Sequence, residues 1–333
     1  EENKRCVPPK SEREIRHIAN SVSKYEPKAP IGSLGETSKT FREAAASLLR
    51  VLAKPGDCRV VSGIPPLDEM TGGYLGGEMI VYTADTGVGK TLLATQTRRA
   101  SCANGAHSLM VSAEMESEHI ASRELVTTSG VLPFKMRRPE LLEQGDWSLL
   151  RKQAATLCNV CRVMDKKTTT LHIARASDEM KAKRNLSLVI IDYDELIDID
   201  AGEGMSETER HSTVAGFAKK LARRLAVPVI LVSQLRKLAP GEKNDKAHGL
   251  SRLYGSGAKA KHASIVIAVR RQYVTTLEGD DREAMISVLK NRNGAVGTVR
   301  CEFIKELLVF VARGLAVEYG SDQSKEENHE RES

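Results

Sequence analysis

The residues best suited to chemistry lie in the stretch MIVYTADTGVGKTLLAT, residues 79–95. An apolar strand, a glycine-bearing turn and a helix follow one another there, which is the order that a phosphate-binding loop requires. Gly87 and Gly89 let the backbone approach a phosphate without an intervening Cβ atom. Lys90 can then reach the β- and γ-phosphates, and the Thr91 hydroxyl can bind Mg²⁺. The stretch predicts a nucleoside triphosphate site.

Six residues of this loop and of the first helical turn are the candidate nucleotide contacts. They are Gly87, Val88, Gly89, Lys90, Thr91 and Leu92. The pattern is A-x-x-x-x-G-K-T, so Ala84 replaces the first glycine that is usual in such loops. An ordinary glycine-rich turn before a helix is the alternative, and the register of strand, lysine and helix argues against it.

Two further predicted strands end in polar residues. The apolar run LSLVIID, residues 186–192, lies well downstream of the loop and ends in Asp192. A carboxylate in that position usually holds Mg²⁺ through water, so we predict Thr91 and Asp192 as the metal-binding residues. The run VILVSQ ends in Gln234, which is placed to sense a γ-phosphate. A solvated strand end is the alternative for Gln234.

Residues 235–262 are a long polar stretch that is rich in basic side chains. A long irregular stretch inside a compact domain is usually functional or disordered. Basic side chains among glycines suit contact with a phosphodiester backbone. A merely solvated face is the alternative, because charge alone is non-specific. The candidate DNA contacts are Lys246, Arg252, Lys259 and Lys261.

Strands and helices alternate from residue 58 onward, which is typical of a parallel sheet in an α/β domain. We expect residues 116–185 to be mostly helical, with a short strand near residues 162–164. A further helix is expected over residues 212–225. The remaining strands should complete the sheet with antiparallel character at one edge. They are residues 264–269, 284–290, 298–303 and 307–311.

Composition sets broad limits on the class of protein. The chain has 333 residues, of which 41% are hydrophobic, and a net charge of +6, which is compatible with a nucleic-acid partner. We expect neither a membrane span nor a signal peptide, and hence no membrane partner. The six cysteines include one C-x-x-C, Cys158 and Cys161, without the second pair that a zinc site needs. We interpret them as reduced, structural cysteines of an intracellular protein.

Six motifs, in this order, resemble those of the DnaB-type hexameric replicative helicases, which belong to the RecA-like ATPases. They are ADTGVGKT (84–91), VSAEM (111–115), LVIIDYDEL (188–196), PVILVSQL (228–235), YGSGAKAKHAS (254–264) and KNRNGAVGTV (290–299). The similarity covers residues 58–312. It implies an α/β fold, a RecA-like P-loop NTPase core with a mainly parallel central sheet, preceded by a short helical N-terminal segment.

The resemblance also implies catalytic roles. Glu114 would orient and activate the attacking water, and a carboxylate near the γ-phosphate is what in-line hydrolysis needs. Glu195 is a second carboxylate that could share this role. Lys290 and Arg292 would reach the γ-phosphate from a neighbouring subunit, as an arginine finger does in trans. A solvated hairpin base is the alternative for these two residues.

In the same family Gln234 would report the γ-phosphate to the adjoining DNA-binding loop, and Lys90, Thr91 and Asp192 would hold ATP and Mg²⁺. Tyr254 and Gly255 stand where bacterial relatives more often have an Arg-Glu pair. The residues of the loop that hold DNA therefore stay open.

The domain division rests on the motifs, on an amphipathic helical pattern before residue 58 and on the charged composition of the last residues. Residues 11–27 resemble the small helical module at the C-terminal side of phage and plasmid primase domains. Since the chain opens at Glu1 without methionine, we interpret it as a fragment of a longer, primase-helicase-like protein. The four parts are residues 1–37, a polar and helical segment; 38–57, a linker helix; 58–319, the ATPase and helicase domain; and 320–333, a charged tail expected to be disordered.

The function that these features favour is an ATP-driven ring, a hexamer, that moves on single-stranded DNA and unwinds duplex. The family resemblance implies movement 5′ to 3′, a direction that the residues themselves do not fix. Expected partners are a primase or a helicase loader, in the cytoplasm at the replisome. One alternative is a RecA- or KaiC-like regulatory ATPase without unwinding activity. Another is a loading module that binds DNA or a partner and hydrolyses little ATP.

Overall fold

The structure is a computed structural model that describes residues 40–42, 44–45, 60–157, 161–165, 168–192, 197–199, 204–235 and 257–319, with side chains up to residue 314. The chain divides into two compact units, Glu1–Asp57 and Cys58–Ser333. In the first unit the described residues are helical, and the Ala44 amide donates to the Thr40 carbonyl at 2.9 Å. The expectations for residues 1–37 and 320–333, and most of the linker helix, lie outside the described residues. The four-part division stays a prediction.

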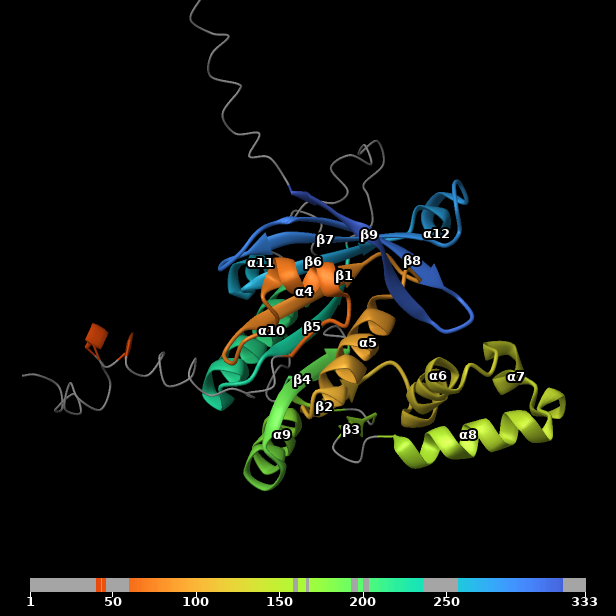
Figure 1. Ribbon diagram of the computed structural model, residues 1–333. Helices are drawn as coiled ribbons and strands as arrows, with labels where there is room; N and C mark the ends of the chain where they lie inside the picture. The colour runs from red at the N-terminus through yellow and green to blue at the C-terminus, as the bar shows by residue number, and fades with distance from the viewer. Residues whose placement is uncertain are drawn as a thin grey trace, which may run out of the picture. The chain divides into compact units, whose positions relative to one another are not determined.

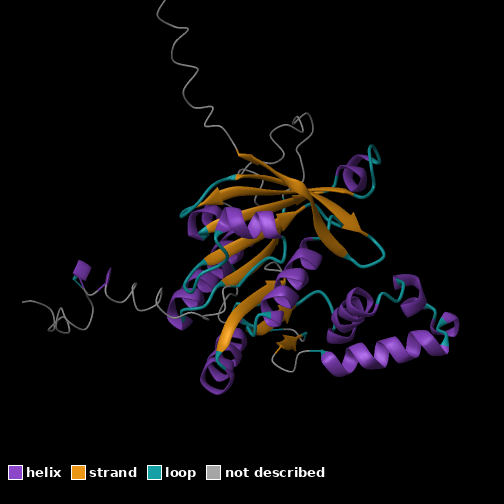
Figure 2. Cartoon of the chain, viewed as in Figure 1, coloured by secondary structure: helices purple, strands orange, loops and turns teal. Residues whose placement is uncertain are grey.

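The second unit is built on one sheet of nine described strands, in the order β3-β2-β4-β5-β1-β6-β7-β8-β9. Figure 2 shows the strands of this sheet in orange. The first six strands are parallel: β3 (Cys161–Met164), β2 (His107–Ser112), β4 (Leu186–Asp192), β5 (Val229–Gln234), β1 (Met79–Ala84) and β6 (Ile265–Arg270). The last three join antiparallel: β7 (Glu283–Asn291), β8 (Gly297–Ile304) and β9 (Val309–Tyr319). The predicted mainly parallel α/β sheet with an antiparallel edge is confirmed.

Helices cover both faces of this sheet (Figure 1). On one face lie α4 (Pro65–Thr71) and α5 (Lys90–Ala103), and on the other α9 (Thr170–Arg184), α10 (Glu207–Leu225) and α11 (Gly257–His262). Three helices and a 3₁₀ turn follow β2: α6 (Ser117–Ser129), α7 (Pro133–Arg137), η2 (Pro139–Leu141) and α8 (Gln144–Thr156). The short helix α12 (Gln272–Thr276) joins β6 to β7.

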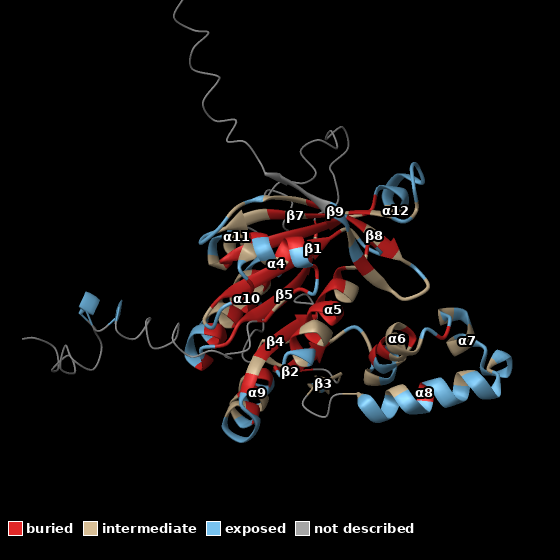
Figure 3. Ribbon diagram, in the orientation of Figure 1, coloured by how far each residue is buried: buried red, intermediate tan, exposed pale blue. Residues whose placement is uncertain are grey.

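The central parallel strands β1, β4, β5 and β6 are nearly continuous apolar runs, as expected where both faces of a sheet are buried. Side chains alternate between the faces along each strand. In β1, Ile80 and Tyr82 pack into the cluster that contains Leu67 of α4. Met79 and Val81 pack into the opposite cluster, which contains residues of α9 and α10. Figure 3 shows the central strands buried, whereas α8 lies largely at the surface.

Several predicted boundaries differ from the structure. The helix expected over residues 212–225 begins at Glu207, because Ser206 and Glu209 form a capping box. The Ser206 hydroxyl accepts from the Glu209 amide at 3.3 Å, and the Glu209 carboxylate accepts from the Ser206 amide at 2.9 Å. The stretch expected to be a polar loop, residues 235–262, ends in helix α11.

The last strand also begins later than expected, at Val309, because residues 305–308 turn and Leu308 has a φ of 56°. The short strand expected near residues 162–164 is β3 and is confirmed.

Gly76, three residues before β1, packs closely against the backbone of Ala226. A Cβ atom at Gly76 would lie 3.0 Å from the Ala226 carbonyl carbon, and closer still to its oxygen. Because this neighbour is backbone, Gly76→Ala should lower the free energy of unfolding by about 1–3 kcal/mol. Gly216→Ala is the matched control, since Gly216 lies within α10 with no atom within 4 Å of the added Cβ. It should stabilise the helix by roughly 0.5–1 kcal/mol. Equal stability of the two variants in urea unfolding would contradict this packing.

Candidate nucleotide and nucleic-acid site

Four of the six predicted catalytic residues lie at the carboxyl ends of four adjacent parallel strands: Lys90, Glu114, Asp192 and Gln234. Ala84, which ends β1, pairs with Gln234 at the end of β5. Asp192, which ends β4, pairs with Ser112 at the end of β2. The Ala113 amide donates to the Asp192 carbonyl at 2.7 Å, so Glu114 follows at the same edge. The phosphate loop, Glu114, Asp192 and Gln234 therefore share the edge at which α/β sheets bind ligands.

The loop has the backbone conformation that its glycines predict. Gly87 has a φ of 79° and Gly89 a φ of 117°. A Cβ atom at Gly89 would also lie 2.9 Å from Cζ of Phe310 in β9. Gln96 of α5 fixes Phe310 from two sides, donating to its carbonyl and accepting from its amide, both at 2.9 Å. The antiparallel edge of the sheet thus supports the loop, a role that its sequence does not signal.

The side chains of the six candidate nucleotide contacts divide into two groups. Val88 is buried in the core, so only its backbone groups are available to a ligand, and the partly buried Leu92 packs against the same cluster. Lys90, the first residue of α5, is 8% exposed, and Thr91 is half-buried beside Asp192. The helix N-terminus and the lysine together provide the positive end that a phosphate requires.

Asp192 is a fully buried carboxylate whose negative charge is poorly compensated within the described part of the chain. It is 0% exposed, and among the described residues neither carboxylate oxygen has a hydrogen-bond partner of good geometry. Burial raises its pKa to about 6, although the Thr91 hydroxyl and the Lys90 ammonium act to lower that pKa. The negative charge of Glu114 raises it further. A divalent cation beside Thr91 would compensate such a buried charge, so these residues fit Mg²⁺.

Arg123 of α6 is a residue of this site that sequence reasoning missed. Its burial lowers the pKa of its guanidinium, while the charges of Asp192 and Glu114 raise that pKa. Arg123 is therefore close enough to interact with both carboxylates. An arginine within a helix carries no distinguishing signal in a single sequence, and only the fold brings it to this edge.

Gln234 and its neighbour Ser233 connect the loop to α11. The Gln234 side-chain amide donates to the Thr86 hydroxyl in the phosphate loop. The Lys259 ammonium donates to the Ser233 hydroxyl at 2.7 Å. Gln234 thus contacts the phosphate loop directly, as its proposed sensing role requires.

The prediction that Lys259 contacts DNA needs correction. Lys259 is 0% exposed, and its ammonium is held inside the fold by Ser233. This burial excludes a contact with a phosphodiester backbone in this conformation. Lys261, on the same helix, is exposed and stays a candidate. Lys246 and Arg252, together with Glu195, Tyr254 and Gly255, lie outside the described residues.

Lys290 and Arg292 lie near the amino ends of the parallel strands, whereas the phosphate loop of the same chain lies at their carboxyl ends. Asn291, between them, pairs with Ile265, which pairs with Ile80 near the start of β1. The loop begins after Ala84, four residues farther along β1. At about 3.3 Å per residue, this separation is on the order of 13 Å. Within one chain, the two cations are therefore far from the phosphate loop.

Lys290, Arg292 and Lys219 of α10 form a cation cluster at the carboxyl end of α11. The Lys290 ammonium donates to the carbonyls of Ala260 and, at 2.9 Å, of Ala263. Arg292 Nη2 donates to the Lys261 carbonyl at 2.6 Å. Burial lowers the Lys290 pKa, and the positive charges of Arg292 and Lys219 lower it further. The cluster is a site of concentrated positive charge that an anion would stabilise.

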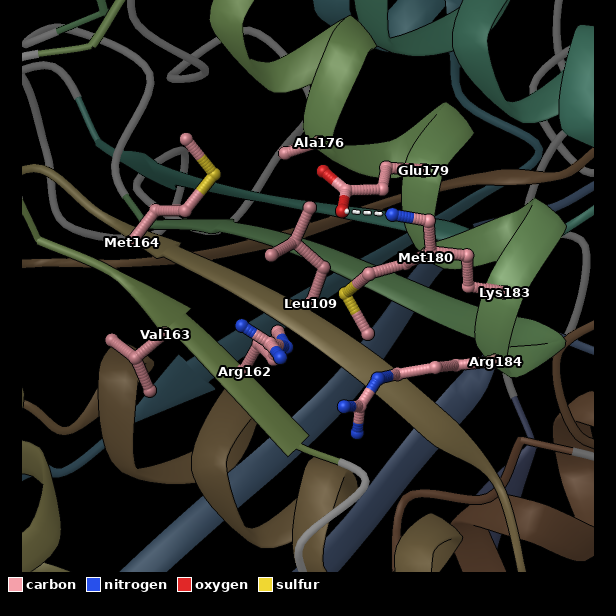
Figure 4. Close-up of a pocket in the computed structure, with 9 residues that line it drawn as sticks. All are labelled: Leu109, Arg162, Val163, Met164, Ala176, Glu179, Met180, Lys183 and Arg184. Atoms are coloured by element: carbon pink, nitrogen blue, oxygen red, sulfur yellow. Dashed lines mark hydrogen bonds and ion pairs between the residues drawn. The ribbon is translucent and has the colours of Figure 1, made fainter.

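A separate cavity of about 370 Å³ lies between β2, β3 and α9. Figure 4 shows Arg162 of β3 and Arg184 of α9 directed into this hollow, and the Lys183 ammonium paired with the Glu179 carboxylate at 3.0 Å. None of the predicted site residues lines it. The described part of the chain contains no helix that is both long and apolar enough to cross a membrane.

Comparison with known proteins gives concordant matches. The family model described as "DnaB-like helicase C terminal domain" matches residues 59–312. The chain is 30% identical over 260 residues to the replicative DNA helicase DnaB of Geobacillus stearothermophilus, covering 76% of this chain and 56% of that relative. Identity and coverage are the same for the replicative DNA helicase DnaC of Bacillus subtilis. The chain thus spans little more than half the length of these relatives.

Solved structures agree with the fold. The structure of an ATPase domain is 27% identical, with a TM-score of 0.74, and the match covers 85% of this chain and 99% of that domain. The structure of a DnaB-like replicative helicase, described with its interactions with primase, is 26% identical, with a TM-score of 0.73 over 90% of this chain and 76% of that one. The expected RecA-like fold is confirmed.

The buried Asp192 carboxylate predicts a pH-dependent stability of the ligand-free protein. Its folded pKa of about 6 exceeds the ordinary value of 3.8, so its favourable contribution is complete below about pH 4 and is lost as the pH rises through 6. Asp192→Asn should therefore gain stability relative to the native chain between pH 4.5 and 7.5, by roughly 1–3 kcal/mol. Denaturant unfolding in EDTA measures this difference.

Glu140→Gln, which alters an exposed carboxylate in the 3₁₀ turn, is the control and should show no such trend. A difference between Asp192→Asn and the native chain that stays constant with pH would contradict the buried, uncompensated charge.

Proposed function

The chain belongs to the DnaB-like helicase C-terminal domain family, and we propose on that basis that it is the motor of a replicative DNA helicase. In this proposal it hydrolyses ATP to move along single-stranded DNA and to unwind duplex. The observation that carries the proposal is the meeting of the phosphate loop, Glu114, Asp192 and Gln234 at one edge of the sheet. These groups are the ones that phosphoryl transfer to water requires.

The residues of this edge divide the work of hydrolysis. Loop amides and Lys90 bind the ATP phosphates, and Thr91 with Asp192 would hold Mg²⁺, which neutralises charge that develops on the phosphate oxygens. Glu114 orients the attacking water and accepts its proton. Arg123 lies near Glu114 and Asp192, and we assign it the positioning of the two carboxylates.

In this proposal, Lys290 and Arg292 of the cation cluster contact the γ-phosphate that is bound at the phosphate loop of a neighbouring subunit. Lys290 and Arg292 lie a strand length away from that loop, so they cannot reach a γ-phosphate bound there. A neighbouring subunit in a ring would bring its loop to them. Their like charges, confined beside Lys219, favour release from the α11 carbonyls when the partner's phosphate arrives. We therefore propose a homo-oligomer, a hexamer, with composite sites.

Helix α11 links the nucleotide to the DNA-binding loop in this proposal. The basic stretch starts directly after Gln234 and ends in α11. Gln234 contacts Thr86 of the phosphate loop, and Lys259 of α11 donates to Ser233. Lys290 and Arg292 hold the other end of the same helix. A change at either phosphate contact would thus be felt by α11 and by the stretch before it.

Partners follow from the family. One structural neighbour is described with its interactions with primase, and we extend a primase contact, or one with a helicase loader, to this chain. Such a protein would work 5′ to 3′ within the cell, at the replisome. No observation favours the regulatory ATPase or the loading module.

Steady-state ATP hydrolysis with and without single-stranded DNA tests the proposal. We expect the rate to rise several-fold with DNA, and Lys90→Ala to lower both rates by on the order of 10²-fold or more, because the lysine stabilises the transferred phosphoryl group. Lys152→Ala is the matched control, since Lys152 is an exposed lysine on α8 and should leave both rates unchanged. Hydrolysis that is indifferent to DNA would contradict a translocating motor.

A further inference from the structure

Two cysteines that are far apart in the sequence meet at the edge of the sheet. Cys102 lies in the last turn of α5, and Cys161 begins the edge strand β3. Their sulfur atoms are 2.8 Å apart, much farther than the about 2.05 Å of a disulfide bond, and both are free thiols. Both are half-buried, whereas Cys301 is fully buried. The pair is therefore in contact and within reach of a small reagent.

Polar side chains around the pair favour a thiolate at Cys161. Either sulfur could donate in the contact between the two thiols, and we assign Cys102 as the donor. This hydrogen bond lowers the pKa of Cys161 well below its ordinary value, and Ser108 and Arg98 act in the same direction against the opposing effect of burial. Arg98 Nη2 is itself held by Glu124 of α6 at 2.9 Å. A thiolate that is partly exposed beside an arginine and a second thiol is the environment of a reactive cysteine.

We propose that Cys102 and Cys161 form a reversible disulfide on exposure to a peroxide, with Cys161 as the attacking thiol and Cys102 as the resolving thiol. The interpretation of all six cysteines as merely structural is then incomplete. The proposal is independent of the nucleotide chemistry. Cys161 lies at the start of β3 and Cys102 at the end of α5, away from the carboxyl ends of the strands where the phosphate loop lies.

The chemistry balances in two steps. The Cys161 thiolate attacks one peroxide oxygen, so that an S–O bond forms, the O–O bond breaks, and the departing hydroxide takes up a proton as water. The Cys102 sulfur then attacks the Cys161 sulfenic acid, the S–S bond forms, and the S–O bond breaks with loss of a second water. Two thiols and one hydrogen peroxide give one disulfide and two waters. A dithiol such as dithiothreitol reverses the oxidation.

The disulfide would join the helix that starts at the phosphate loop to the edge strand of the sheet. It would close a loop between residues separated by 59 positions, which restricts the unfolded chain. Because the sulfurs already touch, the fold needs little adjustment. The oxidised protein should therefore unfold at a higher temperature than the reduced protein.

Peptide mapping of the full chain tests this directly. After treatment with stoichiometric hydrogen peroxide and blocking of free thiols, mass spectrometry under non-reducing conditions should find a Cys102–Cys161 peptide as the main cross-link. Dithiothreitol should remove the cross-link and the rise in melting temperature of several degrees. Cys102→Ser should accumulate a sulfenic acid at Cys161 that dimedone traps, and Cys161→Ser should give neither product.

Cys301→Ser is the control and should behave as the native chain. The map of the native protein decides the matter even if a variant fails to fold. A main cross-link between Cys158 and Cys161, or peroxide-treated protein in which Cys102 and Cys161 are both still reduced, would overturn the proposal.

Discussion

The burial of the Asp192 carboxylate is the constraint on which the site depends. A poorly compensated charge is costly inside a fold, and this one lies at the end of a strand whose apolar residues form the centre of the core. The sheet holds it one strand from Gln234 and next to the strand that leads to Glu114. The buried negative charge of Asp192 therefore destabilises the ligand-free protein, and a cation bound beside Thr91 would compensate it. This compensation would contribute favourably to the binding of a nucleotide with its cation.

A cluster of positive charge lies at the opposite, amino ends of the parallel strands. Lys219 and Arg292 are close enough to lower the pKa of Lys290. Carbonyls at the carboxyl end of α11 accept from Lys290 and Arg292, and the Gly77 carbonyl accepts from Lys219. A second subunit that offered its phosphate loop would give these cations a full negative charge in place of partial ones. Opposite charges at the two ends of the parallel strands would favour head-to-tail association of subunits, as the proposed ring requires.

Much of the fold could be predicted because apolar runs and breakers mark a parallel sheet clearly. The strands ending at Asp192 and Gln234 have the predicted ends, and the edge that joins them follows from parallel pairing. Contacts formed only in three dimensions could not be predicted. Lys259 reads as a surface cation, yet it is buried against Ser233, and Phe310 supports Gly89 from a strand more than two hundred residues away. The start of α10 at Glu207 could have been predicted, because serine followed three residues later by glutamate, here Ser206 and Glu209, is the signal of a capping box.

Complementation between two inactive variants tests the composite site most directly. Lys90→Ala keeps an intact cation cluster, and Arg292→Ala keeps an intact phosphate loop, and each alone should hydrolyse ATP on the order of 10³-fold more slowly than the native chain. Mixed and allowed to exchange subunits, the two should regain a substantial part of the native rate, because some interfaces then pair an intact loop with an intact Arg292. A mixture no more active than its components would contradict a site completed by the neighbouring subunit.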